Sequence, residues 1–232
     1  MRGHALRPSH EPRLGMNARD RILERIRLAL GRGAAAVERE SAAAVRDRLH
    51  NHPRGPAPAM DWELVPRFRQ RCVSLSSTVE ELARLDQVPS AVARYLTGNA
   101  LSPACVCWPE FARLEWAAAG LQVEARPATG EDAVGVSGVF CAIAETGTLM
   151  LLSGPDSYAT TSLLPETHIA VVPAARIVRS MEDGWDLLRT ERGALPRQVT
   201  FVSGPSRTAD IEMTLVLGIH GPYRVHVIVV GG

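Results

Sequence analysis

The sequence predicts an α/β fold, with a mixed, mostly parallel sheet covered by helices. Helical and strand-like segments alternate from residue 61 onward, which indicates βαβ connections between parallel strands. Apolar runs such as Ile169–Val172 and Val227–Val230 contain no polar position, as is typical of strands buried on both faces. An antiparallel portion is expected near Glu145, where strands Val134–Ile143 and Thr148–Leu152 flank a short turn.

Length and composition indicate an ordinary globular protein with one large domain or two small ones. The chain has 232 residues, of which 46% are hydrophobic and 22% are charged, enough for a full hydrophobic core. Because the formal net charge is +1, the charge balance gives no reason to expect binding to nucleic acid or to an acidic membrane surface.

The sequence contains no segment suited to crossing a membrane or to directing secretion. A membrane helix needs roughly 18 or more consecutive apolar residues, and the chain has no such run. Met1–Leu14 is polar and basic, without the apolar centre of a secretory signal. We therefore expect a cytoplasmic protein.

The cysteines argue against an iron–sulfur cluster in this chain. Cys72, Cys105, Cys107 and Cys141 include no C-x-x-C pair, whereas a cubane cluster needs four thiolates, usually in a tight ligand run. We expect them to be buried structural cysteines in a reducing compartment. The histidines of the first 60 residues also lack metal-ligand spacing, so we predict no metal site and no cofactor bound by this chain itself.

Residues 1–60 differ from the remainder, and we expect a mobile tail followed by a helical arm. Asn17 can cap a helix over Arg19–Leu30, and a second helix is expected over Ala34–Leu49. Three prolines in Asn51–Ala59 mark a linker before a single domain over residues 61–232. The arm either docks a partner or packs loosely on its own domain, and both interpretations stay open.

The remaining elements follow from local patterns. A capping box, Ser77 with Glu80, predicts a helix start, and Pro109 suits the first position of another helix. The predicted helices are Trp62–Gln70, Val79–Leu85, Ser90–Leu96, Glu110–Ala119, Ser157–Leu164, Met181–Arg189 and Thr208–Leu217. The further predicted strands are Cys72–Leu75, Ala104–Trp108, Leu121–Ala125, Val199–Val202 and Val225–Val230.

The turn between two apolar strands is the first candidate site. A carboxylate such as Glu145 is costly there unless it lies at a strand end or is paired. It could be a general base, a nucleophile or a hydrogen-bond acceptor for a ligand, with Thr146, Gly147 and Thr148 as ligand-binding neighbours. The alternative is a turn carboxylate that accepts hydrogen bonds from nearby backbone amides.

A small-residue loop after the strand Val199–Val202 is the second candidate. Ligands settle at the carboxyl ends of strands in open α/β sheets, and a helix start attracts anions. Asp210 in the first turn opposes anion binding and suits a well-capped helix instead. The candidate ligand-binding residues are Ser203, Gly204, Ser206, Thr208 and Asp210.

The third candidate is His220, which stands between glycines after the predicted helix. It could shuttle protons or bind a carboxylate, and we predict it as a catalytic residue together with Glu145. The alternative is an imidazole that interacts with the last carbonyls of the helix. His168 precedes a strand and is more typical of a structural histidine.

Four short motifs resemble the LUD-domain family, in the branch of the lactate-utilisation proteins C. They are Ala-Glu-Thr-Gly-Thr at 144–148, Leu-Leu-Pro-x-x-His at 163–168, Ser-Gly-Pro-Ser-x-Thr-Ala-Asp-Ile-Glu at 203–212 and Gly-Ile-His-Gly-Pro at 218–222. Each motif alone is weak, but their common order makes a chance resemblance improbable. The resemblance extends over roughly Asp61–Val230.

The resemblance implies a fold similar to the CoA-transferase, ribose-phosphate isomerase and formyltetrahydrofolate cyclo-ligase group. It also implies a role in oxidising L-lactate to pyruvate beside two partner proteins that carry the iron–sulfur clusters. The chain would then be a component of that system rather than a self-sufficient oxidoreductase. A small-molecule ligand is possible in such a component.

Two other functions stay open at this point. One is an independent enzyme for a phosphorylated or CoA-linked small molecule, with Glu145 as nucleophile or base. The strand-end glutamate of CoA transferases suggests this only by analogy of fold. The other is a non-catalytic interaction module that docks its partner through the basic arm.

Overall fold

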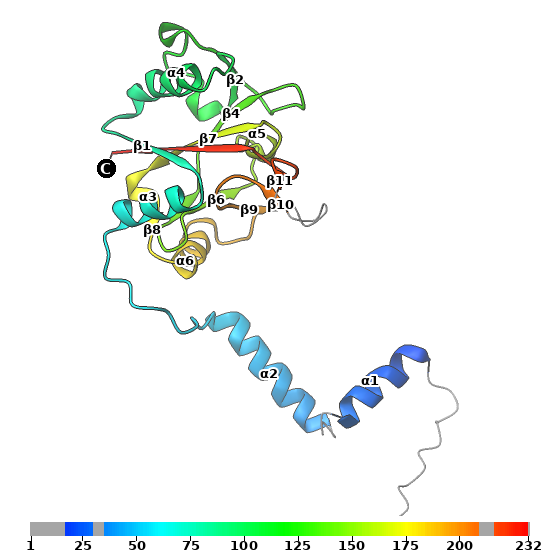
Figure 1. The fold of residues 1–232 in the computed structure, drawn as a ribbon. Coiled ribbons are helices and arrows are strands. Elements are labelled where there is room, and N and C mark those ends of the chain that lie inside the picture. Colours follow the sequence, from blue (N-terminus) through cyan, green and yellow to red (C-terminus); the bar gives the residue numbers. More distant parts are fainter. Residues whose placement is uncertain (1–16, 30–34, 209–215, 232) are drawn as a thin grey trace, which may run out of the picture. The chain divides into compact units, whose positions relative to one another are not determined.

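The computed structural model describes residues 17–29, 35–208 and 216–231. Within this part of the chain no helix is both long and apolar enough to cross a membrane. The chain forms two compact units, Met1–Ala57 and Pro58–Gly232 (Figure 1).

The first unit contains the helices α1 (Ala18–Ala29) and α2 (Ala35–Asn51). Asn17 caps α1 as predicted, because its side-chain Oδ1 accepts a hydrogen bond from the backbone N–H of Asp20 at 2.9 Å. No residue of α1 is buried, and Ile22 is 57% exposed. The role of the first 60 residues as an arm stays a prediction.

A six-stranded parallel sheet forms the centre of the second unit. Its order is β1-β12-β7-β4-β2-β3, and every neighbouring pair is parallel, which confirms the predicted fold class. The apolar runs occupy its middle, where residues of β7 and β12 are buried on both faces. The strands are β1 (Thr78–Leu82), β2 (Ala104–Cys107), β3 (Gln122–Ala125), β4 (Val134–Ser137), β7 (Thr167–Pro173) and β12 (Arg224–Val230).

A separate four-stranded sheet contains the predicted antiparallel portion near Glu145. Its order is β8-β5-β6-β9, with β6 antiparallel to both of its neighbours. In β6, Leu149 and Leu151 face the main core, whereas Met150 and Leu152 face a second core that includes Leu188. The strands are β5 (Cys141–Ile143), β6 (Thr148–Leu152), β8 (Ile177–Val178) and β9 (Val199–Val202).

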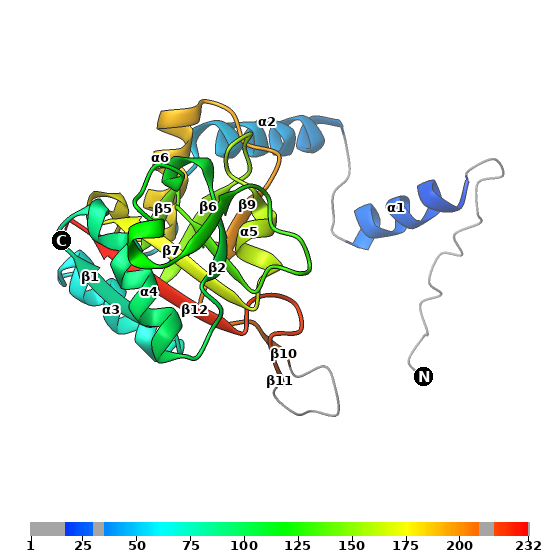
Figure 2. The same ribbon diagram turned by 90° about the horizontal axis from the view of Figure 1, so that it is seen from above.

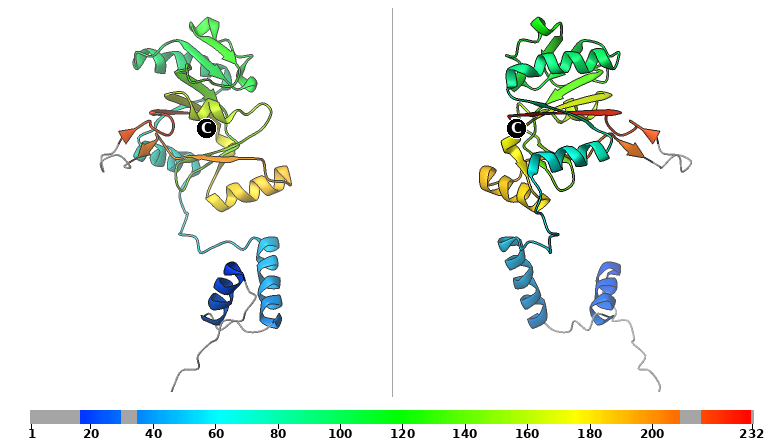
Figure 3. Two further views of the ribbon diagram at one scale, coloured as in Figure 1. Left: turned by 90° about the vertical axis from the view of Figure 1, so that its right-hand side faces the viewer. Right: turned by 60° about the vertical axis from the view of Figure 1, so that its left-hand side comes forward.

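Helices cover the outer faces of both sheets. Figures 1 and 3 show α4 (Val88–Gly98) on one face of the six-stranded sheet, and α3 (Leu64–Ser74) with the four-stranded sheet on the other. The outermost layer is α6 (Met181–Arg192), where Gly184 allows close approach to the sulfur atoms of β5 and β6. The remaining short elements are α5 (Ala159–Leu163), η1 (Leu85–Gln87), η2 (Pro109–Phe111), η3 (Ala117–Ala119) and η4 (Ala174–Arg176).

Two neighbouring elements were predicted wrongly. Cys72–Leu75 is not a strand, because Phe68 and Cys72 are buried on one face of α3 at helical spacing. Thr78–Leu82 is a strand rather than the start of a helix, because it pairs along its length with β12. The Ser77 and Glu80 capping pattern is therefore overridden by tertiary pairing.

Two predicted helices also differ in the structure. Glu110–Ala119 forms the separate 3₁₀ turns η2 and η3, held together by the Trp116 indole N–H, which donates to the Phe111 carbonyl at 2.8 Å. The ends of Thr208–Leu217 are strands, because β10 (Arg207–Thr208) pairs antiparallel with β11 (Val216–Leu217). Figure 2 shows this pair beside the end of the sheet at which β12 begins.

Candidate functional site

The turn that carries Glu145 packs on helix α3. The Gly147 N–H donates to the Ile143 carbonyl at 2.9 Å, and the Glu145 N–H donates to the Arg179 carbonyl at 3.0 Å. Gly147 has a φ of +70°, and a β-carbon there would lie 2.8 Å from the backbone of Arg71. Glycine is therefore required at this turn for both its backbone conformation and its close approach.

Three predicted hydroxyl side chains lie in one hydrogen-bonded chain. Thr148 Oγ1 is 2.8 Å from Thr146 Oγ1 and 2.7 Å from Ser203 Oγ. Thr148 is buried, whereas Ser203 is exposed. Because β6 and β9 pair antiparallel, this chain joins the Glu145 turn to the loop after β9.

That loop continues along the end of α3 to the turn before β12. Gly204 has a φ of +84°, and a β-carbon there would lie 2.5 Å from the Leu75 carbonyl oxygen. The Ser206 N–H donates to the Pro222 carbonyl at 2.9 Å, and the Gly218 N–H donates to the Ser206 carbonyl at 3.0 Å. The predicted motifs at 144–148, 203–208 and 218–222 are thus neighbours in the structure.

The candidate residues nevertheless lie away from the edge where we expected a ligand. The strand before Ser203, β9, belongs to the four-stranded sheet, and its following loop lies beside the amino ends of β1 and β12. The segment after Arg207 begins as a strand, so the predicted helix start at Thr208 is wrong. His220 is exposed, and Asp210 lies outside the described residues.

The carboxyl ends of the parallel sheet have a different site candidate. In the main sheet, the chain passes from β2 to β3, which lies on one side of β2. From β4 the next strand of this sheet is β7, which lies on the other side of the β2–β4 pair. Since β2 and β4 are neighbours, their connections leave in opposite directions, and open α/β sheets bind ligands at such a switch point.

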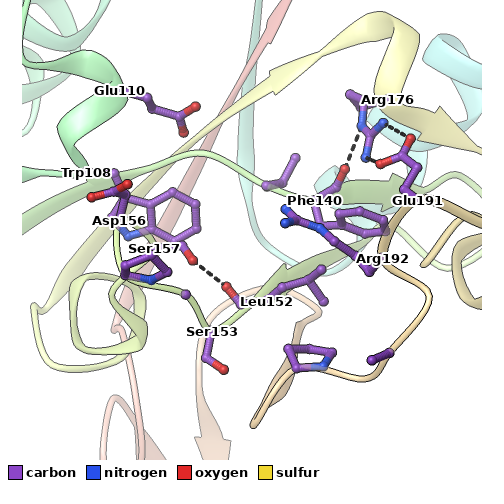
Figure 4. A pocket seen from close by; sticks show the side chains of 15 residues that line it. Trp108, Glu110, Phe140, Leu152, Ser153, Asp156, Ser157, Arg176, Glu191 and Arg192 are labelled. Carbon is purple, nitrogen blue, oxygen red and sulfur yellow. Dashed lines mark hydrogen bonds and ion pairs between the residues drawn. The ribbon is translucent and has the colours of Figure 1, made fainter. Parts of the chain in front are cut away.

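A cavity of about 720 Å³ opens at this switch point. The residues after β2 and β4 line it, together with the turn after β6 and the end of α6 (Figure 4). This volume lies within the range of pockets that hold metabolites and cofactors. None of the predicted site residues that the structure describes lines this cavity.

Glu110 lies on one side of the cavity, against the backbone of Gly138. A β-carbon at Gly138 would stand 2.0 Å from Glu110 Oε1, so the carboxylate occupies the space that a larger residue would fill. Partial burial raises the pKa of Glu110 above its ordinary value. Within the described part of the chain, the carboxylate forms no hydrogen bond or ion pair.

Two arginines face Glu110 from the other side (Figure 4). Arg176 is held in place: its Nε donates to the Phe140 carbonyl at 2.7 Å, and its Nη1 lies 2.6 Å from Glu191 Oε1. Arg192 forms no ion pair among residues 17–29, 35–208 and 216–231. Figure 4 shows its guanidinium end directed toward the open middle of the cavity.

The cysteines are buried, and none of them lines this cavity. Desolvation raises the pKa of Cys72 and Cys105 to about 12. The same cause raises the pKa of Cys107 and Cys141 to about 11, so all four are neutral thiols at physiological pH. Among the described residues, no group of three or more histidine, cysteine or acidic side chains is arranged to hold a metal ion.

The sequence analysis missed Glu110, Gly138, Arg176 and Arg192. Glu110 directly follows Pro109, where an acidic residue is typical of the first turn of a helix. Its place just after a predicted parallel strand could have indicated the site. The residues after β4 lie at the same carboxyl edge of the sheet, where open α/β sheets bind ligands. Nothing local in the sequence around Arg192 indicates that it lines a cavity.

Comparisons with known proteins agree with the motif resemblance. The profile of the LUD domain matches residues 109–230. Lactate utilization protein C of Bacillus subtilis (strain 168) is 30% identical over 188 residues, which cover 72% of this chain and 78% of that protein. Lactate utilization protein C 1 of Bacillus mycoides is 45% identical over 91 residues, which span 38% of this chain and 39% of that protein.

A solved structure has the same fold. The crystal structure of a DUF162 family protein from Deinococcus radiodurans matches with a TM-score of 0.56 at 26% identity. The match covers 75% of this chain and 100% of the other. It supports the parallel α/β architecture on which the switch point depends.

Proposed function

Because the chain belongs to the LUD domain family, we propose that it is a component of a lactate utilisation system. In this proposal the system oxidises L-lactate to pyruvate, and this chain works beside two iron–sulfur proteins rather than as a self-sufficient oxidoreductase. The observation that carries it is the match with lactate utilization protein C of Bacillus subtilis, which extends over most of both chains.

The state of the cysteines supports a redox centre in the partners rather than in this chain. An iron–sulfur cluster needs thiolate ligands, which converge on the metal. Here Cys72 lies in α3, Cys105 and Cys107 in β2, and Cys141 in the separate four-stranded sheet. Among the described residues, no three such side chains are grouped as metal ligands would be.

An independent activity with Glu145 as nucleophile receives less support from the geometry. The Glu145 turn is partly buried against α3, and the residues that precede and follow it are fixed by backbone pairing. The candidate cavity lies at the other edge of the parallel sheet, without Glu145 in its wall. We therefore favour the component role.

The test is a deletion of the gene in its own host, followed by growth on L-lactate as the carbon source. We expect growth to be lost and restored by the intact gene, while growth on pyruvate is unchanged. Undiminished growth on L-lactate, in a strain without a second copy, would contradict the proposal.

A biochemical arm of the same test separates membership of the system from an indirect effect. A tagged full-length chain is purified from lactate-grown cells, and co-purifying proteins are identified together with their iron content. Lactate-dependent dye reduction is then measured with and without this chain. We expect iron–sulfur proteins to co-purify and dye reduction to fall when the chain is removed.

A further inference from the structure

The cavity at the switch point combines charged side chains with apolar ones. Arg192 and Glu110 are exposed side chains at its two ends, Asp156 adds a second carboxylate to the lining, and Phe140 and Leu152 line the space between the ends. The polar groups of such a pocket fix the orientation of a ligand and determine its specificity.

The backbone positions the carboxyl group, which argues against a chance surface arrangement. Pro109 starts the 3₁₀ turn η2 directly after β2, and this turn carries Glu110 toward β4. Gly138 leaves the open space in which the carboxylate rests, with the Trp108 ring beside it. Two neighbouring parallel strands therefore determine where this group lies.

Arg192 differs from the other cationic groups near the cavity. Arg176 is already bonded to Glu191 and to a backbone carbonyl, so its charge is balanced within the wall. A cation near the end of a helix also stabilises that helix, and both Arg189 and Arg192 stand in the last turn of α6, where Arg189 is paired with Asp186 at 2.7 Å. Of these three, Arg192 alone faces the cavity without a hydrogen bond or ion pair to a carboxylate among the described residues, although its charge, beside the hydrogen bond from Arg176, helps to lower the pKa of Glu191 through space.

We propose that this cavity binds a hydroxylated organic anion larger than lactate, with Arg192 at its anionic group and Glu110 at a hydroxyl. A guanidinium binds a carboxylate or a phosphate through paired charge-assisted hydrogen bonds. A carboxyl group accepts from a hydroxyl when ionised and can donate when protonated. The volume of about 720 Å³ exceeds what a three-carbon acid fills, which favours a larger ligand.

The site stands apart from the proposed role in lactate utilisation, because it is argued from the cavity alone. Binding is measured on the purified chain, whereas the metabolic role is measured by growth. A chain that binds no anion can still be required for growth on L-lactate, and the reverse also holds.

The experiment is isothermal titration calorimetry on the full-length chain. The probes are gluconate and glucose 6-phosphate, which share a six-carbon hydroxylated skeleton but differ in their anionic group, and L-lactate as the smaller comparison. We expect one-to-one saturable binding of gluconate or glucose 6-phosphate at millimolar concentrations or below, and weaker binding of L-lactate. Which of the two larger probes binds more tightly identifies the preferred anionic group.

Two variants connect the binding to the named residues. Arg192→Gln should weaken binding of the larger anion about ten-fold or more, since it removes a charge-assisted contact. Glu110→Gln keeps the shape of the side chain but cannot ionise. Any change in affinity with pH that results from the titration of Glu110 should therefore be absent in this variant. Arg189→Gln is the matched control on the same helix and should bind as the wild type does.

Three outcomes overturn the proposal. Neither larger anion gives saturable binding at millimolar concentrations, L-lactate binds as tightly as both, or Arg192→Gln binds as well as Arg189→Gln. Circular dichroism and the unfolding midpoint of each variant establish that weakened binding does not result from loss of the fold.

Discussion

The carboxylate of Glu110 lies over the backbone of Gly138, in the place where any other residue would carry its β-carbon. These two residues follow neighbouring parallel strands whose connections leave in opposite directions. The absence of a side chain just after β4 thus leaves the space that a carboxyl group following β2 occupies.

We expect Gly138→Ala to displace the Glu110 carboxylate while leaving the fold intact. The new methyl group would meet Oε1 at 2.0 Å, but that atom is the end of a flexible side chain and can move toward solvent. The pKa of Glu110 should then fall toward its ordinary value, because the desolvation that raises it is relieved. Titration of the carboxyl carbon resonance by NMR measures this shift.

Gly130→Ala is the control for that experiment, because nothing lies within 4 Å of the methyl group it adds. It should leave the Glu110 titration unchanged. If Gly138→Ala titrates Glu110 as the wild type does, the carboxylate does not depend on the open space at Gly138.

Gly147 and Gly120 form a matched pair for testing close packing at the Glu145 turn. Both have positive φ, +70° and +77°, so alanine at either position is strained by about 1–2 kcal/mol. Only at Gly147 would the β-carbon also meet the backbone of α3, at 2.8 Å from Arg71 and Cys72. Overpacking of this kind typically adds about 1–3 kcal/mol.

We therefore expect Gly147→Ala to lower the free energy of unfolding by clearly more than Gly120→Ala, which has open space around it. Urea denaturation of both variants beside the wild type gives the comparison. Equal destabilisation would mean that the turn moves away from α3 without cost.

The strands β2, β6, β7 and β12 were expected within about two residues of their observed places, because their apolar residues form short runs between clear breaks. The predicted strand Val134–Ile143 was wrong as one element, since it forms β4 and β5, which lie in different sheets. The pattern could not divide the strands between two sheets, because β6 is buried on both faces by different cores.

The elements between Cys72 and Leu82 show where local signals fail. A capping pattern at Ser77 favours a helix start, yet the following residues complete an edge of the parallel sheet by pairing with β12. Such pairing joins residues almost 150 positions apart, as in Thr78 with His226, and no local pattern records it. Contacts between distant parts of the chain therefore determine the secondary structure of both the end of α3 and β1.

The predicted site residues were found through motifs, and the motifs do lie together. Thr146, Thr148 and Ser203 form one hydroxyl chain, and Ser206 holds the turn before β12. Strand pairing and the packing of glycines on α3 explain much of this arrangement. The roles of these hydroxyl residues in ligand binding stay a prediction. The cavity residues depend on strand order, which the sequence alone does not reveal.

Two buried histidines make the stability of the protein sensitive to acid. His168 is fully buried with its Nε2 2.8 Å from Ser137 Oγ, and His226 is stacked on Tyr95 with its Nδ1 2.8 Å from Thr78 Oγ1. Burial lowers the pKa of each from 6.5 to about 4. Both are therefore neutral in the folded protein at pH values where they are protonated in the unfolded chain.

The folded state consequently loses stability as the pH falls from about 6.5 toward 4, and above 6.5 this contribution is fully present. A shift of this size corresponds to about 3 kcal/mol per histidine by the lower end of the window. Urea denaturation at pH 7, 5.5 and 4.5 measures the decrease. His226→Gln should make the decrease shallower, and an unchanged free energy of unfolding between pH 7 and 4.5 would contradict the assignment.

The cysteines allow a final prediction about thiol reactivity. All four are buried free thiols, and desolvation raises their pKa values to between about 11 and 12. Because the thiolate is the reactive form, the folded protein should react slowly with a chromogenic disulfide reagent at pH 8. Unfolding in guanidinium should release four rapidly reacting thiols. Rapid labelling of even one or two thiols in the folded protein would mean that a cysteine is accessible and ionised, which would contradict the burial of all four side chains.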